Sequence, residues 1–315
     1  MTDVAVGVDI GGTSSRALAV YADGRVAGRG TAGGGNPNSH PPALAAKRVA
    51  EAVAAALPTG SVVAGCLLGM AGESKVTDPA VLSVFETALR HAGVGCPIEV
   101  VSDAEVAFAS ATSSPDGTVL IGGTGSVAAR IVARRKESWR GGWGWLLGDE
   151  GSAYWIGRQA VRSTLAVLQS TEAVGPLGRA VLDAAVAEPF TDDVAGRRLA
   201  LSRLITSANA EAPIRLARFA SLVSELATTD PAAADIIAEA AGLLIDQAHI
   251  ARAPGETTPV VLAGSVIGPT SPVGQALRER LSGETEVLFA PDGALGAAWL
   301  AALEAWGPKA PRPQA

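Results

Sequence analysis

Two glycine-rich turns, each following an apolar strand-like run, are the first residues whose types and spacing could do chemistry. They read Asp9-Ile10-Gly11-Gly12-Thr13 and Ile121-Gly122-Gly123-Thr124-Gly125-Ser126. Glycine has no side chain to block a phosphate and reaches positive φ, so successive N–H groups can point at one anion. The hydroxyls in both turns add donors, and Asp9 could hold Mg²⁺ directly or through water. The alternative interpretation is a pair of tight hairpin turns without a ligand.

A single acidic residue, Asp103, lies where a short apolar strand, 98–101, meets a predicted helix, 104–111. One interpretation is a helix N-cap, because the Asp carboxylate accepts hydrogen bonds from helix N–H groups. The other is a base at the carboxyl edge of a sheet, where α/β proteins bind ligands. The two are compatible. A helix N-terminus would favour the ionised form, which can accept a substrate hydroxyl proton.

The densest cluster of chemical side chains is the run GGWGWLLGDEGSAYW at 141–155, and four of the six tryptophans fall between 139 and 155. Aromatic rings beside carboxylates suit a sugar, because rings pack on C–H faces while Asp149 and Glu150 accept bonds from hydroxyls. A hydrogen bond to such a charged acceptor contributes roughly 1.5–3 kcal/mol. The alternatives are core packing for Trp155 and a helix cap for Asp149 and Ser152.

A second polar loop, 33–39, offers two amides, Asn36 and Asn38. Asn and Pro also favour turns without any ligand, so turn chemistry is the alternative there.

Other nucleotide-binding motifs are absent or lack the structural context that they need. No Gly-Lys pair exists for a Walker A loop. Residues 28–33 formally match G-x-G-x-x-G, but glycines and prolines follow instead of a helix.

The elements that must position these residues follow from the apolar periodicity. Strands are predicted at 4–8, 16–21, 25–31, 61–68, 98–101, 118–121, 127–133, 259–263 and 286–289, with a hairpin at Asp23-Gly24. Helices are predicted at 43–57, 79–92, 104–111, 152–170, 180–187, 213–227, 232–251, 273–281 and 295–306. This order predicts an α/β fold with mixed sheets and helices on both faces.

An internal repeat organises the chain. At an offset of 111 residues, Ile10-Gly11-Gly12-Thr13-x-Ser15 matches Ile121-Gly122-Gly123-Thr124-x-Ser126. Chance in a glycine-rich chain is one explanation; two related sheets, each opening with strand, glycine turn and strand, is the other. We expect an N-terminal domain at 1–116, joined by the C-terminal helix 294–306. We also expect a larger domain at 117–293, which contains a helical insertion, and a flexible tail at 307–315.

Composition excludes several classes of protein. The chain has 315 residues, 48% hydrophobic, and a net charge of −6, which argues against a nucleic-acid partner. No apolar run is long enough for a membrane span, and the first residues lack the features of a signal peptide. The two cysteines, Cys66 and Cys96, are too few for a disulfide scaffold, and the three histidines form no metal motif. We expect a cytoplasmic protein.

The two glycine turns and Ala263-Gly264-Ser265 resemble the phosphate and adenosine motifs of the actin/hexokinase superfamily. The run 141–156 is closely similar to N-acetylglucosamine kinases of the BadF/BadG/BcrA/BcrD-type ATPase family, and the resemblance covers about 4–303. It implies two ribonuclease-H-like (actin-like ATPase) domains with a nucleotide and sugar cleft between them. The implied reaction transfers the γ-phosphoryl of ATP to the 6-hydroxyl of N-acetylglucosamine, giving N-acetylglucosamine 6-phosphate and ADP.

The resemblance also implies residue roles and a homodimer. Asp103 would take the proton of the sugar 6-hydroxyl. The residues that match nucleotide-binding positions are Asp9, which would also hold Mg²⁺, Gly11, Gly12, Thr13, Gly123, Thr124, Gly125, Gly264 and Ser265. The residues that match sugar-binding positions are Asn36, Asn38, Asp103, Gly142, Trp143, Asp149 and Glu150.

Related activities stay open at this point. Glucosamine would need a carboxylate near its ammonium, for which Glu150 is the candidate in the motif, and N-acetylmuramic acid would need a cation, with Arg140 bordering the run. Residues 65–72 lack the serine that some members place against the sugar, which leaves the preferred 2-substituent open. An activator ATPase of a 2-hydroxyacyl-CoA dehydratase is disfavoured, because both cysteines precede residue 100. A non-catalytic sugar sensor is disfavoured because both turns and Asp103 are intact.

Overall fold

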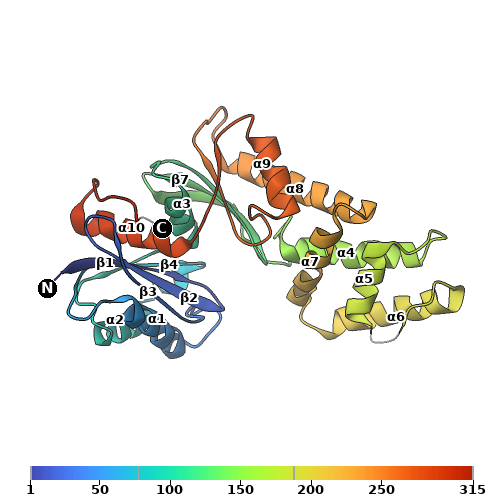
Figure 1. The fold of residues 1–315 in the computed structure, drawn as a ribbon. Coiled ribbons are helices and arrows are strands. Elements are labelled where there is room, and N and C mark those ends of the chain that lie inside the picture. The colour runs from blue at the N-terminus through green and yellow to red at the C-terminus, as the bar shows by residue number, and fades with distance from the viewer. Residues whose placement is uncertain (1, 77, 187–188, 314–315) are drawn as a thin grey trace. The chain divides into compact units, whose positions relative to one another are not determined.

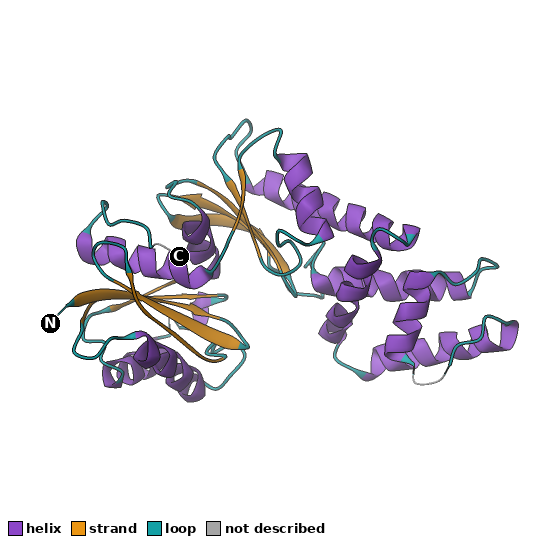
Figure 2. Cartoon of the chain, viewed as in Figure 1, coloured by secondary structure: helices purple, strands orange, loops and turns teal. Residues whose placement is uncertain are grey.

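The computed structural model describes residues 2–76, 78–186 and 189–313 and has a mixed α/β architecture with two five-stranded sheets (Figures 1 and 2). The predicted α/β class is therefore confirmed. By its internal contacts the chain divides into two compact units. Unit 1 comprises 1–119, 131–137 and 290–315, and unit 2 comprises 120–130 and 138–289. The expected domain boundaries stay a prediction.

The sheet of unit 1 places three strand ends at one edge. Its strands are β1 (Asp3–Ile10), β2 (Ser14–Val20), β3 (Val26–Gly33), β4 (Val62–Met70) and β5 (Ile98–Ser102), in the order β3-β2-β1-β4-β5. β1 to β3 pair antiparallel, whereas β4 is parallel to β1 and β5 is parallel to β4. The carboxyl ends of β1, β4 and β5 therefore share an edge.

Helices cover both faces of this sheet. They are α1 (Pro42–Ala56), the 3-10 turn η1 (Glu73–Lys75), α2 (Pro79–His91), α3 (Asp103–Ala111) and α10 (Gly293–Trp306). Figure 1 shows α1 and α2 on one side of the sheet and α10 on the other. The two-residue period of β1 explains this arrangement. Val4, Val6 and Val8 belong to the core under α1 and α2, and Ala5 belongs to the core with Ala298 of α10.

Unit 2 contains most of the second sheet and a helical insertion, whereas 117–119, 131–132 and 135–137 of that sheet fall in unit 1. The strands are β6 (Gly117–Gly122), β7 (Ser126–Val132), β8 (Arg135–Gly141), β9 (Val260–Ala263) and β10 (Val287–Phe289), in the order β10-β9-β6-β7-β8. The helices are α4 (Ala153–Leu168), α5 (Pro176–Ala185), α6 (Val194–Ala210), η2 (Pro213–Phe219), α7 (Ala220–Leu226), α8 (Pro231–Ala251) and α9 (Pro272–Leu281). One hydrophobic cluster joins Leu120 and Leu262 of the sheet to Trp155 of α4 and Leu244 of α8. Trp155 is therefore a core residue, which agrees with the alternative interpretation that it packs in the core.

Three described elements escaped the sequence prediction: β8, α6 and the short 3-10 turn η1. β8 reads RKESWRG, which has no apolar alternation, and the turn before it uses Ala133 and Arg134 at positive φ instead of Gly, Asn or Asp. α6 buries only Ala200 and Leu204 among its residues, so it carries no apolar stripe. Residues 213–227, predicted as one helix, split into η2 and α7. Residue 187, the end of the predicted helix 180–187, lies outside the described residues.

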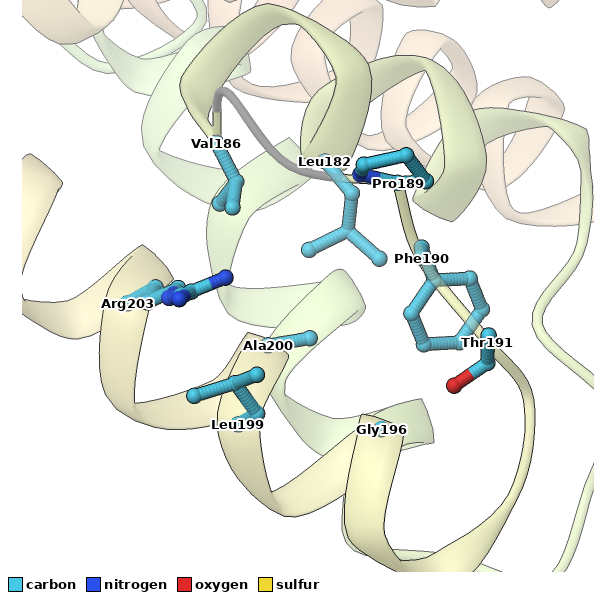
Figure 3. Close-up of a pocket in the computed structure, with 9 residues that line it drawn as sticks. All are labelled: Leu182, Val186, Pro189, Phe190, Thr191, Gly196, Leu199, Ala200 and Arg203. Carbon is cyan, nitrogen blue, oxygen red and sulfur yellow. The ribbon is translucent and has the colours of Figure 1, made fainter.

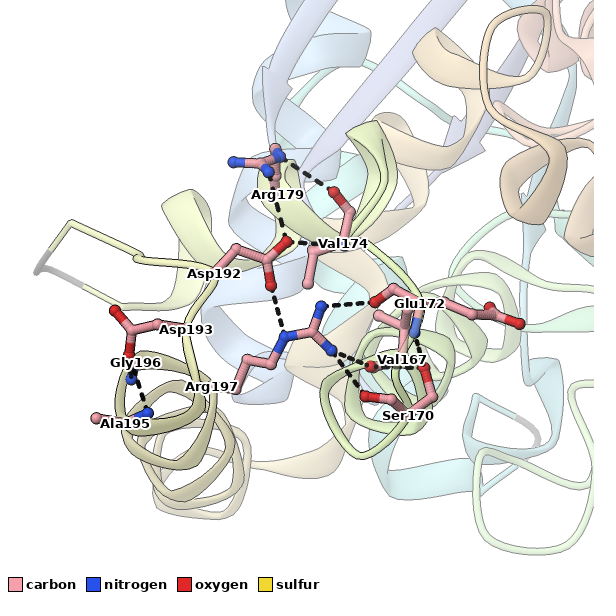
Figure 4. Close-up of polar contacts among 10 residues, drawn as sticks. All are labelled: Val167, Ser170, Glu172, Val174, Arg179, Asp192, Asp193, Ala195, Gly196 and Arg197. Carbon is pink, nitrogen blue, oxygen red and sulfur yellow. Dashed lines mark hydrogen bonds and ion pairs between the residues drawn. The ribbon is translucent and has the colours of Figure 1, made fainter.

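Arg197 ties α6 to the preceding loops. Its Nε donates to Asp192 Oδ1 at 2.6 Å, and its Nη atoms donate to the carbonyls of Ser170 at 2.8 Å and Glu172 at 2.6 Å (Figure 4). These carbonyls follow the C-terminus of α4 and have no helical partner. Arg197 therefore holds α6 against the loop that follows α4, where few apolar side chains of α6 are buried.

The segment 307–313 after α10 packs within unit 1. The buried indole of Trp299 donates to the Ala310 carbonyl at 3.0 Å, because a buried indole N–H needs an acceptor. Arg312 donates to the Ser110 carbonyl at 2.6 Å and lies over the Trp299 ring. The described part of the expected tail, 307–313, thus contacts α3 and α10, and the flexibility expected for 307–315 stays a prediction; residues 314–315 lie outside the described residues.

Within the ranges that the structure describes, no helix combines the length and the apolar character needed to cross a membrane.

Candidate functional site

The carboxyl edge of the unit 1 sheet collects several of the predicted site residues. Asp9 pairs in register with Gly69, and Met70 pairs with Ser102. The turn after β1, the loop after β4 and Asp103 after β5 therefore lie along the same edge.

The first glycine turn lies directly against the asparagine loop. Gly11 N donates to Ser14 O at 2.8 Å and closes the turn, leaving Gly12 and Thr13 exposed. His40 Nε2 lies 2.7 Å from the Gly12 carbonyl, and a Cβ on Gly34 would lie 2.0 Å from the same oxygen. The structure thus brings the predicted phosphate turn and the predicted sugar loop together.

Both candidate asparagines bind the loop that follows β4. The Asn36 amide donates to the Ala71 carbonyl at 3.0 Å, and the Asn38 amide donates to the Gly72 carbonyl at 3.0 Å. Asn38 N also donates to Asn36 Oδ1 at 2.8 Å, which is the expected turn chemistry. Asn36 is 5% exposed, whereas Asn38 is exposed, so Asn38 presents the more accessible amide. Lys75 Nζ donates to the Pro37 carbonyl at 2.9 Å and adds a cation beside the loop.

Asp103 is the first residue of α3, and it is not the cap. Ser102 is the N-cap, in a reciprocal capping box in which Ser102 N donates to Glu105 Oε2 at 2.7 Å. The N-cap interpretation of Asp103 is therefore wrong, although its carboxyl interacts with the backbone N–H of Ala104, which opposes the rise of its pKa. Burial, followed by repulsion from Asp9, raises the pKa of Asp103 to about 6. The sequence predicts that the helix N-terminus favours the ionised form, but burial and the charge of Asp9 outweigh that effect and raise the pKa.

Asp9 lies beside a second carboxylate and an arginine that sequence reasoning missed. Arg16 of β2 forms an ion pair with Asp9, and its Nη1 lies 3.6 Å from Asp292 Oδ1. Asp292 is the N-cap of α10 and accepts from Ala294 N at 3.1 Å. Burial raises the pKa of Asp9, against the opposing effect of Arg16. An Asp before a glycine and an apolar helix was the available signal for Asp292.

In unit 2, the second glycine turn adjoins the predicted adenosine motif. Gly123 N donates to Gly125 O at 3.0 Å, and Val266 N donates to Gly122 O at 3.0 Å. Gly264 has a φ of +102°, and a Cβ there would lie 2.4 Å from the Gly122 carbonyl oxygen. A glycine is therefore required at 264. Ser265 is exposed next to it.

The tryptophan and acidic run divides into exposed and buried parts. Gly142 N donates to Ser126 O at 2.9 Å, and Trp143 is 65% exposed. Asp149 is 6% exposed, has a φ of +59°, and accepts from Ser126 N at 3.2 Å. Burial raises the pKa of Asp149. Glu150 is exposed, and its backbone carbonyl accepts from the Ser126 hydroxyl at 2.8 Å.

Helix capping explains one residue of this run and not the other. The Ser152 hydroxyl accepts from Trp155 N at 3.3 Å and is the N-cap of α4, as its alternative interpretation held. The Asp149 carboxylate instead contacts the second glycine turn, where a Cβ on Gly125 would lie 2.7 Å from Asp149 Oδ1. Asp149 is therefore directed at the turn and not at the helix.

A cavity of about 50 Å³ lies in the helical insertion of unit 2, lined by side chains of α5, α6 and the loop between them (Figure 3). Its lining includes Leu182, Phe190 and Leu199 and none of the predicted site residues. The lining side chains are largely apolar and include no carboxylate, so this cavity offers no acid–base chemistry.

A family model matches most of this chain, and two curated relatives match parts of it. The model of the BadF/BadG/BcrA/BcrD ATPase family matches residues 6–301. An N-acetylmuramic acid/N-acetylglucosamine kinase of Clostridium acetobutylicum is 37% identical over 31% of this chain and 31% of its own length. An N-acetyl-D-glucosamine kinase of Dictyostelium discoideum is 30% identical over 55% of this chain and 57% of its own length. The chain thus spans about a third and just over half of these two curated relatives.

Solved structures share the fold. A Chromobacterium violaceum protein, provisionally named an N-acetylglucosamine kinase, superposes with a TM-score of 0.71 at 25% identity, covering 94% of this chain and 98% of the other. A ROK family glucokinase from Streptomyces griseus, solved with glucose and AMPPNP, gives 0.52 at 21% identity and covers 95% and 99%. The second likeness shows the fold alone. The family match extends over both glycine turns, Asp103 and the tryptophan run, and this chain belongs to the BadF/BadG/BcrA/BcrD ATPase family.

Proposed function

We propose that this protein is an ATP-dependent amino-sugar kinase that phosphorylates the 6-hydroxyl of N-acetylglucosamine, giving N-acetylglucosamine 6-phosphate and ADP. The observation that carries the proposal is Asp103. This carboxyl has a pKa raised to about 6 and lies at the same sheet edge as the first glycine turn and the asparagine loop. The family match and the names of both curated relatives support a kinase of amino sugars.

Asp103 acts as the general base in this proposal. Its carboxylate accepts the proton of the sugar 6-hydroxyl while that oxygen forms a bond to the γ-phosphorus. The bond from the γ-phosphorus to the bridging oxygen breaks, and ADP leaves. A base with a pKa of about 6 is mostly ionised at neutral pH and still basic enough to share a proton in the transition state. Because Ser102 caps α3, the Asp103 carboxyl is available for this task.

The phosphates bind to backbone N–H groups of the glycine turns. Gly12 and Thr13 are exposed at the first turn. At the second, among the described residues and apart from its chain neighbours, no heavy atom lies within 4 Å of where a Cβ on Gly123 would be. Open backbone of this kind can approach an anion closely. Gly264, packed on the second turn, supports a nucleoside position next to it.

The residues around Asp9 fit Mg²⁺. Asp9 and Asp292 face one cation, the Arg16 guanidinium, and carboxylate oxygens are the ligands that Mg²⁺ prefers. Among the described residues, no group of three or more His, Cys, Asp or Glu is arranged to hold a metal ion, but Mg²⁺ at phosphate sites commonly uses one or two carboxylates. A bound Mg²⁺ would neutralise phosphate charge. Asp9 would hold it, with Asp292 as a second candidate.

The sugar is held, in this proposal, by amides and by the acidic run. Asn36 and Asn38 provide amide groups beside the first turn, and Asp149 and Glu150 provide carboxylates beside the second. The exposed ring of Trp143, next to Gly142, offers a face for sugar C–H groups. N-acetylmuramic acid is a second candidate substrate. Lys75 places an ammonium at the asparagine loop, where it could pair with a lactyl carboxylate.

The cysteines argue against an activator ATPase that would hold an iron–sulfur cluster. Cys66 is buried in β4, and burial raises the pKa of its thiol. A buried, protonated thiol is a poor cluster ligand. Partial burial also raises the pKa of the Cys96 thiol.

The test is ADP release in a coupled assay with N-acetylglucosamine, N-acetylmuramic acid, glucosamine and no sugar. We expect ADP release to depend on added N-acetylglucosamine and the product to be the 6-phosphate by NMR. Lys75→Met should lower the rate with N-acetylmuramic acid and leave the rate with N-acetylglucosamine unchanged. No sugar-dependent ADP release from any of these sugars would refute the proposal.

Two finer expectations accompany this function. We propose a homodimer, which light scattering on the purified full chain measures directly. We also propose a cytoplasmic location, which cell fractionation measures. A monomer at assay concentrations would refute the first, and recovery in the membrane or secreted fraction would refute the second.

A further inference from the structure

Ser126 uses every polar group it has to bind the tryptophan and acidic run. Its N–H donates to Asp149 Oδ1 at 3.2 Å, and its hydroxyl donates to the Glu150 carbonyl at 2.8 Å. Its own carbonyl accepts from Gly142 N at 2.9 Å. Ser126 is 3% exposed, so these bonds are not exchanged freely with water. The first residue of β7 is therefore joined to both ends of the loop 142–150.

The rest of the second glycine turn is joined to the same segment. Ala153 N donates to Gly123 O at 2.9 Å, and Tyr154 N donates to Thr124 O at 3.3 Å. Each residue from 123 to 126 except Gly125 thus hydrogen-bonds to the segment 142–154. Gly125 instead contacts it by packing, since a Cβ there would lie 2.7 Å from Asp149 Oδ1. The turn and the segment form one bonded assembly within unit 2.

The backbone of Asp149 has an uncommon conformation that neighbouring contacts must hold in place. Its φ is +59°, in a region that non-glycine residues adopt rarely, although Asp and Asn tolerate it better than most. It is also buried, with its carboxylate against the turn. Such a conformation persists where surrounding contacts determine it. Ser126 N supplies one of these contacts, and Ser152 N, which donates to the Asp149 carbonyl at 3.2 Å, supplies another.

We propose that Ser126 is a positioning residue that couples the sugar to the nucleotide. A sugar that binds Asp149 or Glu150 moves the acceptors of Ser126, and Ser126 passes that movement to the N–H groups of the turn 123–125. The inference rests on the proposed function, in which the acidic run meets the sugar and the turn meets the phosphates. Since a coupling free energy is reciprocal, each ligand should then tighten the other by the same factor.

The experiment measures the dissociation constant of N-acetylglucosamine by calorimetry, without and with saturating Mg–AMPPNP. For the natural chain we expect the sugar to bind about 5-fold or more tightly with the nucleotide present, the lower end of typical couplings. Ser126→Ala removes the hydroxyl that binds Glu150, so the ratio should fall towards one. Ser126→Thr retains a hydroxyl and should restore much of it. Thr164→Val is the matched control. It removes a buried hydroxyl that donates to the Ala160 carbonyl inside α4, and its ratio should equal that of the natural chain.

Asp149→Asn keeps the experiment decisive if Ser126→Ala does not fold. Asn tolerates positive φ and fills the same volume, but a neutral amide oxygen is the weaker acceptor for Ser126 N. The ratio in this variant, taken against its own sugar affinity, should also fall.

A natural chain with sugar-dependent ADP release but a ratio near one would overturn the inference and leave the proposed function standing. So would a Ser126→Ala variant that melts at a lower temperature yet keeps the natural ratio, because that is a structural role only. Absence of sugar-dependent ADP release in the natural chain is the separate failure of the proposed function.

Discussion

Replacing Asp103 by Asn should remove the activity and stabilise the protein at neutral pH. The structure raises the pKa of this carboxyl from an ordinary 3.8 to about 6, chiefly by burial and then by repulsion from Asp9. At 1.36 kcal/mol per pKa unit, holding the ionised form costs the folded state about 3 kcal/mol, as an order of magnitude. Asn is neutral and of similar size, so it does not incur that cost.

The sign of the pH dependence follows from the direction of the shift. A carboxyl whose folded pKa lies above its unfolded value favours folding below the unfolded pKa. That contribution is lost as the pH rises through the folded value. Between pH 4 and 6, Asp103 therefore loses its favourable contribution, and at pH 7 and above the loss is complete. The stability gain of Asp103→Asn should be largest at pH 7 to 8 and vanish below pH 4.

Urea unfolding at pH 4, 5.5 and 7.5 measures the stability difference, and ADP release measures the activity. We expect a fall in turnover of about 100-fold or more, the lower range for a general base. Asp235→Asn, on the exposed surface of α8, is the matched control and should change neither quantity. Turnover above a tenth of the natural rate, or a stability loss at pH 7.5 as large as at pH 4, would refute this account of Asp103.

Four further outcomes are expected. In the natural chain, kcat/KM should fall about tenfold per pH unit below about 6, because Asp103 must be ionised; a profile flat to pH 4.5 would contradict that. Arg16→Gln removes the ion pair that orients Asp9 and should raise the KM for Mg–ATP several-fold in initial-rate assays, with the KM for sugar unchanged. Gly264→Ala forces a Cβ to within 2.4 Å of a turn carbonyl at positive φ, so it should lower the melting temperature and raise the KM for ATP, whereas an unchanged melt would contradict the packing. Leu182→Ala, at a side chain 2% exposed, should cost about 2–5 kcal/mol in urea unfolding without altering kcat.

The sequence predicted the elements that carry strong local signals. Both strand–glycine turn–strand units occur, as β1 with β2 and β6 with β7, because apolar runs and glycines mark their ends. The Asp23-Gly24 hairpin forms for the same reason, with Gly24 at a φ of 83°. Tertiary contacts decided what was missed. β8 and α6 lack a periodic apolar pattern; ladder pairing holds β8, and the Arg197 network together with buried Ala200 and Leu204 holds α6. Asp292 reaches Asp9 from nearly 300 residues away, and no local pattern encodes that distance.

The pKa of Asp103 shows why a correct rule about local structure can predict a shift in the wrong direction. A carboxylate in the first turn of a helix gains about 0.3–1 kcal/mol from the helix dipole at an exposed site. A shift from 3.8 to about 6 corresponds to about 3 kcal/mol in the opposite direction. The local gain can be read from the spacing of strand and helix, but the larger cost depends on burial and on Asp9, which β1 brings to the same edge through β4. A general base needs the raised pKa. A carboxyl with an ordinary pKa would be ionised at neutral pH, but its carboxylate would be too weak a base to take an alcohol proton efficiently. The pairing of β1, β4 and β5 therefore both assembles this edge of the sheet and sets the basicity of its central carboxyl.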